Sequence, residues 1–129
     1  MKTLLFIMLL GGTLLIASAK EPKFPAFEVS SHDAPAVRFA FSAADASSSS
    51  PVVISVPGRA LKKEDRAHRV DLQKHWLSVN VPKTFTFKIR TLDQCEYKRD
   101  GEFAAADHYV FEDATGHQFD YYFYVGNWP

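Results

Sequence analysis

Large aromatic side chains near the C-terminus are the residues of this sequence best suited to binding a ligand. If the last strand runs through this segment, alternate side chains point to opposite faces, and the apolar set that begins at Phe119 takes the core side. The opposite face then holds Tyr122 and Tyr124, and Trp128 follows just beyond the strand. Exposed rings of this size stack on sugars or anchor protein partners. The sequence therefore predicts a ligand-binding surface of Tyr122, Tyr124 and Trp128, extended by Tyr109. The alternative is a strand covered on both faces, with the same rings packed inside.

Cys95 is the only cysteine, and three roles are open to it: a buried small hydrophobe, one half of an intermolecular disulfide, or a nucleophile. The thiolate is the reactive form, and the apolar neighbours expected across a hairpin, Ala104 and Ala106, disfavour it. The sequence contains no Gly-x-Ser-x-Gly elbow, glycine-rich phosphate loop or calcium-binding loop. Carboxylates are numerous in residues 93–120, but spacing alone assigns no pair of them to acid and base roles. We therefore expect no catalytic residue and no cofactor, and keep a thiol- or carboxylate-dependent enzyme as an alternative.

The five histidines do not have the spacing of a metal site. His68 and His75 are seven residues apart, which places them on one face of a helix but on opposite faces of a strand. His108 is expected to lie across a strand pair from Tyr122, away from His117 at the next turn. Zinc and copper sites need three or four convergent ligands, and no His-x-His or His-Glu-x-x-His motif is present. The sequence therefore predicts no bound metal.

Charge is balanced over the chain but not along it. Fifteen basic and fifteen acidic side chains cancel, so no general attraction to nucleic acid is expected. Residues 59–75 carry six Lys or Arg against three acids, whereas residues 93–120 carry eight acids against two bases. Arg66 and Arg69 are therefore candidates for binding a charged partner; the alternative is that both segments are solvated loops. An inhibitor or immunity-type protein that blocks a hydrolase would insert this basic segment, or the serines of residues 47–50.

The N-terminal 19 residues have the pattern of a secretory signal peptide. Lys2 precedes an apolar run over residues 4–16, and residues 17–19, Ala-Ser-Ala, form the small-x-small pattern that signal peptidase cleaves after. The apolar run is too short for a membrane span, which needs about 20 residues. We therefore expect a cleaved signal over residues 1–19 and one mature domain over residues 20–129. That domain is expected to be secreted or periplasmic, without stable membrane insertion, and homo-oligomerisation is left open.

Apolar side chains recur with a period of two over most of the mature chain, which is typical of strands with one buried face. We expect strands at residues 24–29, 37–41, 51–56 and 84–91, the last with Phe85, Phe87 and Ile89 on its buried face. Two segments between them are not expected to be strands. Residues 43–50 have the composition of a mobile surface loop. Residues 59–67 favour a charged loop or one helical turn that runs into a strand at about residue 69, although Leu72 and Trp76 also fit one face of a helix.

Two hairpins are predicted to end the chain. Asp100-Gly101 suits a tight type I′ turn, which would pair Arg99 with Glu102, Tyr97 with Ala104 and Cys95 with Ala106. Residues 113–116 suit a longer turn closed by Gly116, which would pair two sets of aromatic side chains. These pairs are Phe111 with Phe119 and Tyr109 with Tyr121.

The predicted fold is a single all-β antiparallel sandwich of about seven or eight strands, with a small barrel as the runner-up. The predicted function is an exported, non-enzymatic binding module for a protein or glycan ligand in the envelope or extracellular space.

Overall fold

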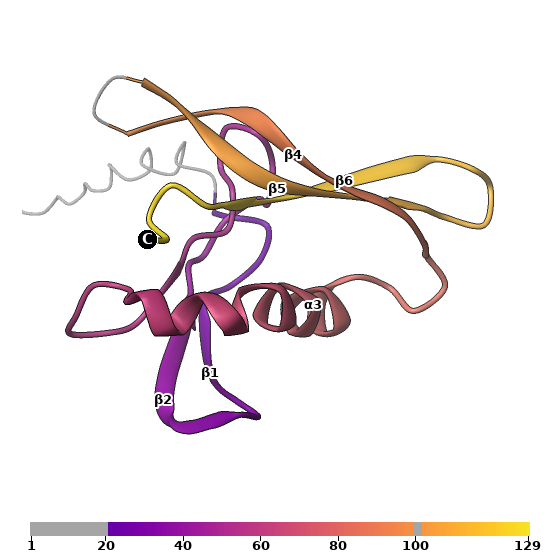
Figure 1. Cartoon of the computed structure of the whole chain (residues 1–129). Helices are drawn as coiled ribbons and strands as arrows, with labels where there is room; N and C mark the ends of the chain where they lie inside the picture. The colour runs from indigo at the N-terminus through magenta and orange to yellow at the C-terminus, as the bar shows by residue number, and fades with distance from the viewer. Residues whose placement is uncertain (1–20, 100–101) are drawn as a thin grey trace, which may run out of the picture.

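Figure 1 shows the computed structural model of the chain, which describes residues 21–99 and 102–129. This part is mainly β, with two three-stranded antiparallel sheets. The first sheet has the order β1 (Phe27–Ser31), β2 (Ala34–Phe41) and β3 (Ile54–Ser55), and the second has the order β4 (Thr86–Arg99), β5 (Glu102–Glu112) and β6 (Gln118–Tyr124). A 3-10 helix, η1 (Lys63–His68), runs directly into the α-helix α3 (Arg69–Asn80) between the sheets. The described residues thus form six strands rather than seven or eight, and their two sheets do not close into a barrel.

The first two strands lie close to where the alternating pattern predicted them. β1 and β2 pair antiparallel, with Phe27 opposite Phe41 and Val29 opposite Phe39. The rings of Phe27 and Phe41 stack with centroids 4.7 Å apart. Phe39 and Phe41 are both buried, so the apolar face of this hairpin belongs to the core.

The third strand is shorter than the β-branched run of residues 51–56 predicts. Val52 pairs with β6 instead: its amide donates to the Tyr122 carbonyl (2.9 Å), and its carbonyl accepts from the Tyr124 amide (2.8 Å). The side chains of Val52 and Ile54 are both fully buried. This run therefore joins the two sheets through the core rather than extending one of them.

A helix replaces the strand that was expected to begin at about residue 69. Leu72 and Trp76 are four residues apart, as are Gln73 and Leu77, and all four side chains are buried on the inner side of α3. Strand alternation would have placed Leu72 and Trp76 on one face and Gln73 and Leu77 on the opposite face. The helix ends at Asn80, and the residue that follows it, Val81, is extended, as expected of a residue before proline.

The segment over residues 43–50 is built into the fold rather than being the mobile loop that its composition predicts. Ala44 and Ala46 are buried, because their small side chains fit against the core. The Ala46 carbonyl accepts from the Tyr122 amide (2.8 Å), and the Ser48 carbonyl accepts from the Tyr97 amide (3.0 Å). The segment therefore bonds to both β6 and β4.

The hairpin between β5 and β6 has the predicted register. Phe111 pairs with Phe119, Tyr109 with Tyr121, and His108 lies opposite Tyr122. Gly116 has φ +87°, the left-handed conformation that the turn requires of it. The aromatic pairing is confirmed.

The register between β4 and β5 differs from the prediction over part of its length. Arg99 pairs with Glu102 as expected, but Cys95 pairs with Ala104 rather than Ala106, and Tyr97 leaves the ladder. The cause is a bulge between Cys95 and Lys98. Its two residues bond to the 43–50 segment instead: the Glu96 amide donates to the Ser48 hydroxyl (2.8 Å), and the Tyr97 amide to the Ser48 carbonyl. The predicted turn residues, Asp100 and Gly101, lie outside the described part of the chain.

A second bulge, between Phe87 and Ile89, changes which face of β4 is apolar. The extra residue inverts the alternation, so that Arg90 rather than Ile89 lies opposite Tyr109. Phe87 and Ile89 are 53% and 51% exposed, so the prediction that both are buried on one face is wrong.

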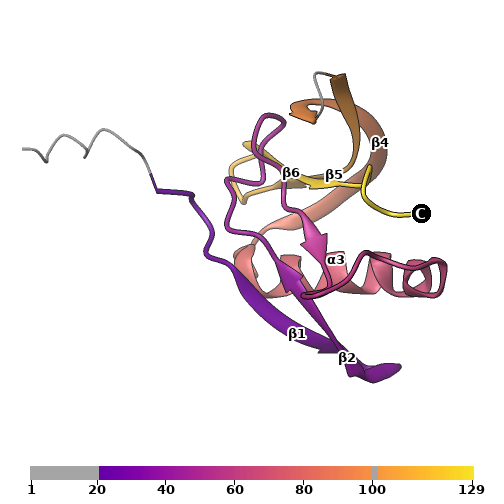
Figure 2. The same ribbon diagram turned by 90° about the vertical axis from the view of Figure 1, so that its left-hand side faces the viewer.

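The α3 helix lies along one face of the β4–β6 sheet, with β1 and β2 extending on its other side (Figures 1 and 2). Trp76 is fully buried at this junction and contacts Phe24, Tyr121 and Phe123 edge-on or tilted. No helix among residues 21–99 and 102–129 has the length and apolar content needed to cross a bilayer.

Candidate functional site

A groove runs between α3 and the inner face of the β4–β6 sheet. Its volume is about 680 Å³, which lies within the range of small-molecule sites. It is lined by Val70, Lys74, Leu77, Ser78, Val81, Pro82, Lys83, Phe85, Phe87, Arg90, Tyr109 and Phe111. We call this site the α3 groove.

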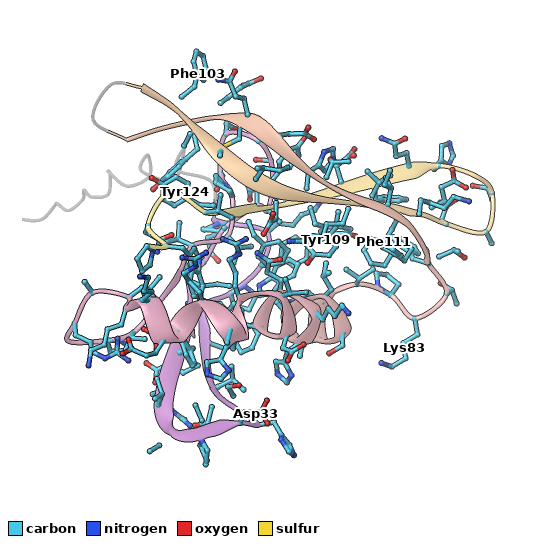
Figure 3. All side chains as sticks on the ribbon, in the orientation of Figure 1. Asp33, Lys83, Phe103, Tyr109, Phe111 and Tyr124 are labelled. Atoms are coloured by element: carbon cyan, nitrogen blue, oxygen red, sulfur yellow. The ribbon has the colours of Figure 1, made fainter. Side chains whose placement is uncertain are left out.

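The floor of the α3 groove is made of rings from β4 and β5. Figure 3 shows Tyr109 and Phe111 pointing toward α3, whereas Phe103 points away from it. The ring of Phe87 contacts Phe111 edge-on (5.7 Å) and Tyr109 at a tilt (6.3 Å). Phe87 is still 53% exposed, because α3 does not cover it. The groove therefore offers apolar surface that the protein itself leaves in contact with water.

A polar network beneath one end of the groove holds α3 to the sheet. Asp107 is 2% exposed and accepts a hydrogen bond from the Gln73 side-chain amide (2.7 Å). The Gln73 amide oxygen in turn accepts from the Tyr109 hydroxyl (2.6 Å). Two guanidinium groups face the carboxylate, with Arg69 Nε 3.5 Å and Arg90 Nη2 3.4 Å from its oxygens. The buried charge of Asp107 is thus compensated from both α3 and β4.

Tyr109 is the ring most affected by this environment. Burial raises the pKa of Tyr109 to about 12, with the Asp107 carboxylate adding to the rise and Arg90 opposing it. Its hydroxyl therefore stays a hydrogen-bond donor at neutral pH and keeps Gln73 in place.

A second cluster of ionisable groups lies on the opposite face of the same sheet. His108 contacts Asp93 through Nδ1 and Asp120 through Nε2, both at 2.7 Å. Its ring stacks on Tyr122 with centroids 4.2 Å apart. Hydrogen bonds from His108 and Thr91 lower the pKa of Asp93. Both ring nitrogens of His108 are therefore already engaged by carboxylates of the protein itself.

The exposed aromatic surface expected at the C-terminus is not formed. Tyr124, Trp128 and Tyr109 are 7%, 8% and 2% exposed, and Tyr122 is half-buried under His108. The ring of Tyr97 lies edge-on against Tyr124 (5.1 Å), brought there by the bulge in β4. The structure has the alternative arrangement, a last strand covered on both faces. Of the four residues, only Tyr109 contributes to the α3 groove.

The two arginines expected to bind a partner do not act as a pair. Arg66 is exposed on η1, whereas Arg69 is half-buried and directed at Asp107. The serines of residues 47–50 likewise bond within the fold, with Ser48 attached to β4. Their proposed role in blocking a hydrolase stays a prediction.

Cys95 is 2% exposed, and its thiol donates to the Ala104 carbonyl (3.1 Å), which agrees with its interpretation as a small buried side chain. Within residues 21–99 and 102–129, no group of three or more His, Cys, Asp or Glu side chains is arranged to hold a metal ion.

Most of the residues that line the α3 groove were not among the expected site residues. Lys74 and Leu77 come from a segment that was expected to be a strand, and Arg90 reaches the inner face only through the bulge at residue 88. The sequence feature that pointed to a helix in this segment was the four-residue spacing of Leu72 and Trp76.

No protein-family model, curated protein or solved structure matches this chain.

Proposed function

We propose that this protein is an exported, non-enzymatic binding module that holds an elongated apolar ligand in the α3 groove. The observation that carries the proposal is the groove itself, with about 680 Å³ lined mainly by aliphatic and aromatic side chains. A ligand in it would cover the exposed half of Phe87 and remove its apolar surface from water. None of the residues that line the groove is a His, Cys, Asp or Glu, which favours binding over catalysis.

Export is the second part of the proposal and rests on the pattern of residues 1–19. Cleavage after residue 19 would release a single mature domain into the periplasm or the medium. We also propose that the two sheets, with α3 beside them, act as a sandwich-like scaffold for the groove. In this proposal the groove replaces the aromatic surface that was expected to take a protein or glycan ligand, because those rings are buried.

A neutral, environment-sensitive dye such as N-phenyl-1-naphthylamine tests the groove. Phe87→Ala removes an exposed ring from the groove and should weaken dye binding about fivefold, since a half-exposed phenyl is worth about 1 kcal/mol on full burial. Leu92→Ala is the matched control, because Leu92 is 66% exposed on the same strand but does not line the groove. Equal binding by the two variants, or no binding by the wild type, would contradict the proposal.

A further inference from the structure

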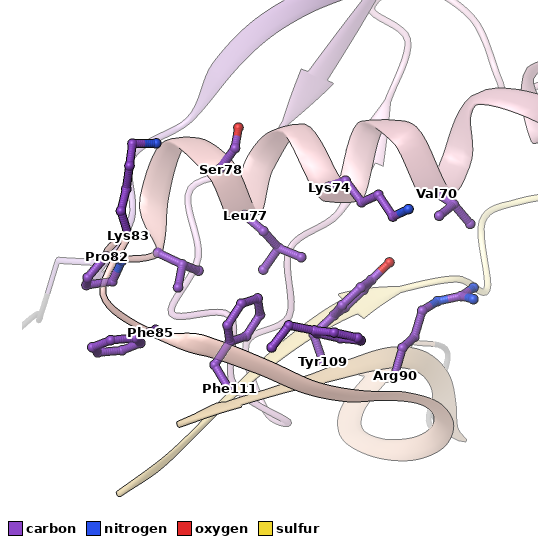
Figure 4. Close-up of a pocket in the computed structure, with 12 residues that line it drawn as sticks. Val70, Lys74, Leu77, Ser78, Pro82, Lys83, Phe85, Arg90, Tyr109 and Phe111 are labelled. Atoms are coloured by element: carbon purple, nitrogen blue, oxygen red, sulfur yellow. The ribbon is translucent and has the colours of Figure 1, made fainter. Parts of the chain in front are cut away.

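The α3 groove has a charged end and an apolar end. Figure 4 shows Lys74 and Arg90 at the end near Val70, whereas Pro82 and Phe85 lie at the other end. Lys83 also lies at that other end, but its side chain points away from Phe85. Leu77 and Phe111 lie between the two ends. A ligand that fits both ends carries a charged head and an apolar body.

The charged end has an excess of positive charge. Arg69, Lys74 and Arg90 contribute three positive charges, and Asp107, the acid between the two arginines, contributes one negative charge, which leaves an excess of two. Lys74 is exposed and has no ion pair within the described part of the chain. An anionic head group would complete the charge balance at this end.

Arg90 is held in a position to bind that head group. One of its terminal nitrogens faces Asp107 at 3.4 Å. Its guanidinium carbon lies 5.9 Å from the centroid of the Tyr109 ring. Tyr109 is itself held by Gln73. A guanidinium has five N–H donors, so the contact with Asp107 leaves donors for a planar two-oxygen acceptor. A carboxylate is the acceptor whose two oxygens match the paired N–H donors of a guanidinium.

The length of the groove sets the shape of the apolar body. From Val70 to Val81 the helix rises about 16 Å, and the groove residues of α3 are spread over that span. The aromatic floor runs beside them. An extended alkyl chain matches this length, whereas a compact ring system would leave one end of the groove empty.

We propose that the ligand of the α3 groove is a free long-chain carboxylate, with its head between Lys74 and Arg90 and its chain along Leu77, Phe87 and Phe111. This assignment rests on the proposed function and adds the chemical class and the orientation of the ligand.

Calorimetric titration of the purified protein with dodecanoate and with dodecanol tests the head group. Dodecanoate should bind about tenfold more tightly, because the alcohol lacks the charge and the second oxygen. Arg90→Gln and Lys74→Gln should each bring the ratio of dodecanoate to dodecanol affinity close to one. Lys74 is exposed, so its replacement tests the proposal even if Arg90→Gln disturbs Asp107 and the fold. Arg38→Gln and Lys63→Gln are the matched controls, since both side chains are exposed and lie outside the groove.

The outcomes separate this inference from the proposed function. Equal affinity for dodecanoate and dodecanol, with the neutral dye still bound, would overturn the carboxylate assignment and leave the groove as an apolar site. Failure of the dye and both dodecyl compounds to bind would overturn the proposed function as well. Tight binding of an apolar peptide with a free C-terminal carboxylate, without binding of dodecanoate, would overturn the assignment in favour of a peptide.

Discussion

The ionisation of Tyr109 provides a direct test of the contact between α3 and the sheet. The folded state holds the pKa of Tyr109 at about 12 through burial, against 10.0 for a tyrosine in water. The unfolded chain therefore ionises Tyr109 over a pH range in which the folded protein keeps it protonated. Between pH 10 and about 12 the unfolded state binds fewer protons than the folded state, so the free energy of unfolding falls as the pH rises.

The magnitude follows from these two pKa values. The difference between 10.0 and about 12 corresponds to about 3 kcal/mol. Tyr109 is 2% exposed, so screening by solvent reduces this value little. The contribution is complete below pH 10 and lost above about pH 12. The total stability of a domain of this size is about 5–15 kcal/mol, which makes the loss a large part of it.

Urea unfolding of the wild type and Tyr109→Phe over this pH range isolates the effect. The phenylalanine variant cannot ionise at this position, so its stability should fall less between pH 10 and about 12, by about 3 kcal/mol at most. Near neutral pH the variant should instead be less stable by about 1–2 kcal/mol, because Gln73 loses the donor 2.6 Å from its oxygen. Burial also raises the pKa values of Tyr121 and Tyr122, but both are present in both proteins and their contributions cancel.

Parallel stability curves for the two proteins would refute the reasoning. They would mean that Tyr109 ionises equally easily in the folded and unfolded states, and hence that α3 does not exclude water from its ring. An ultraviolet titration of the folded proteins is an independent test. In the wild type, the tyrosinate absorbance of Tyr109 should appear only near pH 12, and the Tyr109→Phe variant should lack this component.

Three further predictions concern other parts of the fold. Trp76→Ala removes a fully buried ring at the junction of α3 and the sheets and should lower the free energy of unfolding by about 3–5 kcal/mol in urea. The lowered pKa of Asp93, caused mainly by His108, confers stability that is present near neutral pH and lost as the pH falls through that lowered value. Asp93→Asn should therefore make the acid limb of the stability curve shallower. Cys95 is 2% exposed and should react with a thiol reagent only in denaturant; rapid labelling of the native protein would contradict its burial.

The parts of the fold that sequence reasoning predicted correctly are those set by local signals. The β5–β6 hairpin combines a turn glycine at position 116 with aromatic side chains at matched distances on both sides of the turn centre at residue 115. One register pairs rings with rings, and a slip of one residue would set Tyr109 against Asp120 and Phe119 against Val110. Such a choice requires no knowledge of the rest of the chain.

The helix α3 was missed because its decisive contacts are distant in sequence. Leu72 and Trp76 fit a helix or a strand, and a strand was expected from about residue 69. The helical arrangement is set by what Trp76 and Gln73 contact, namely β5 and β6 and the segment around Phe24. None of these contacts is encoded in the spacing of residues 69–80.

The α3 groove could not be predicted for a related reason. Its charged end joins Lys74 from a helix with Arg90 from a strand, and a bulge decides on which face Arg90 lies. A bulge depends on which residues leave the ladder, and the strand pattern alone does not locate it.

The buried network connects the stability of the fold to the proposed ligand site. Gln73 is fully buried and bonds to both Asp107 and Tyr109, the two groups that face Arg90. A polar residue at a buried helix position costs free energy unless its partners are in place, so α3 can dock in full only when this network is complete. The same network thus contacts both the docked helix and Arg90. A substitution that loosens Gln73 should accordingly reduce both the selectivity for a carboxylate head and the affinity for an alkyl chain, because Leu77 of α3 forms part of the groove wall.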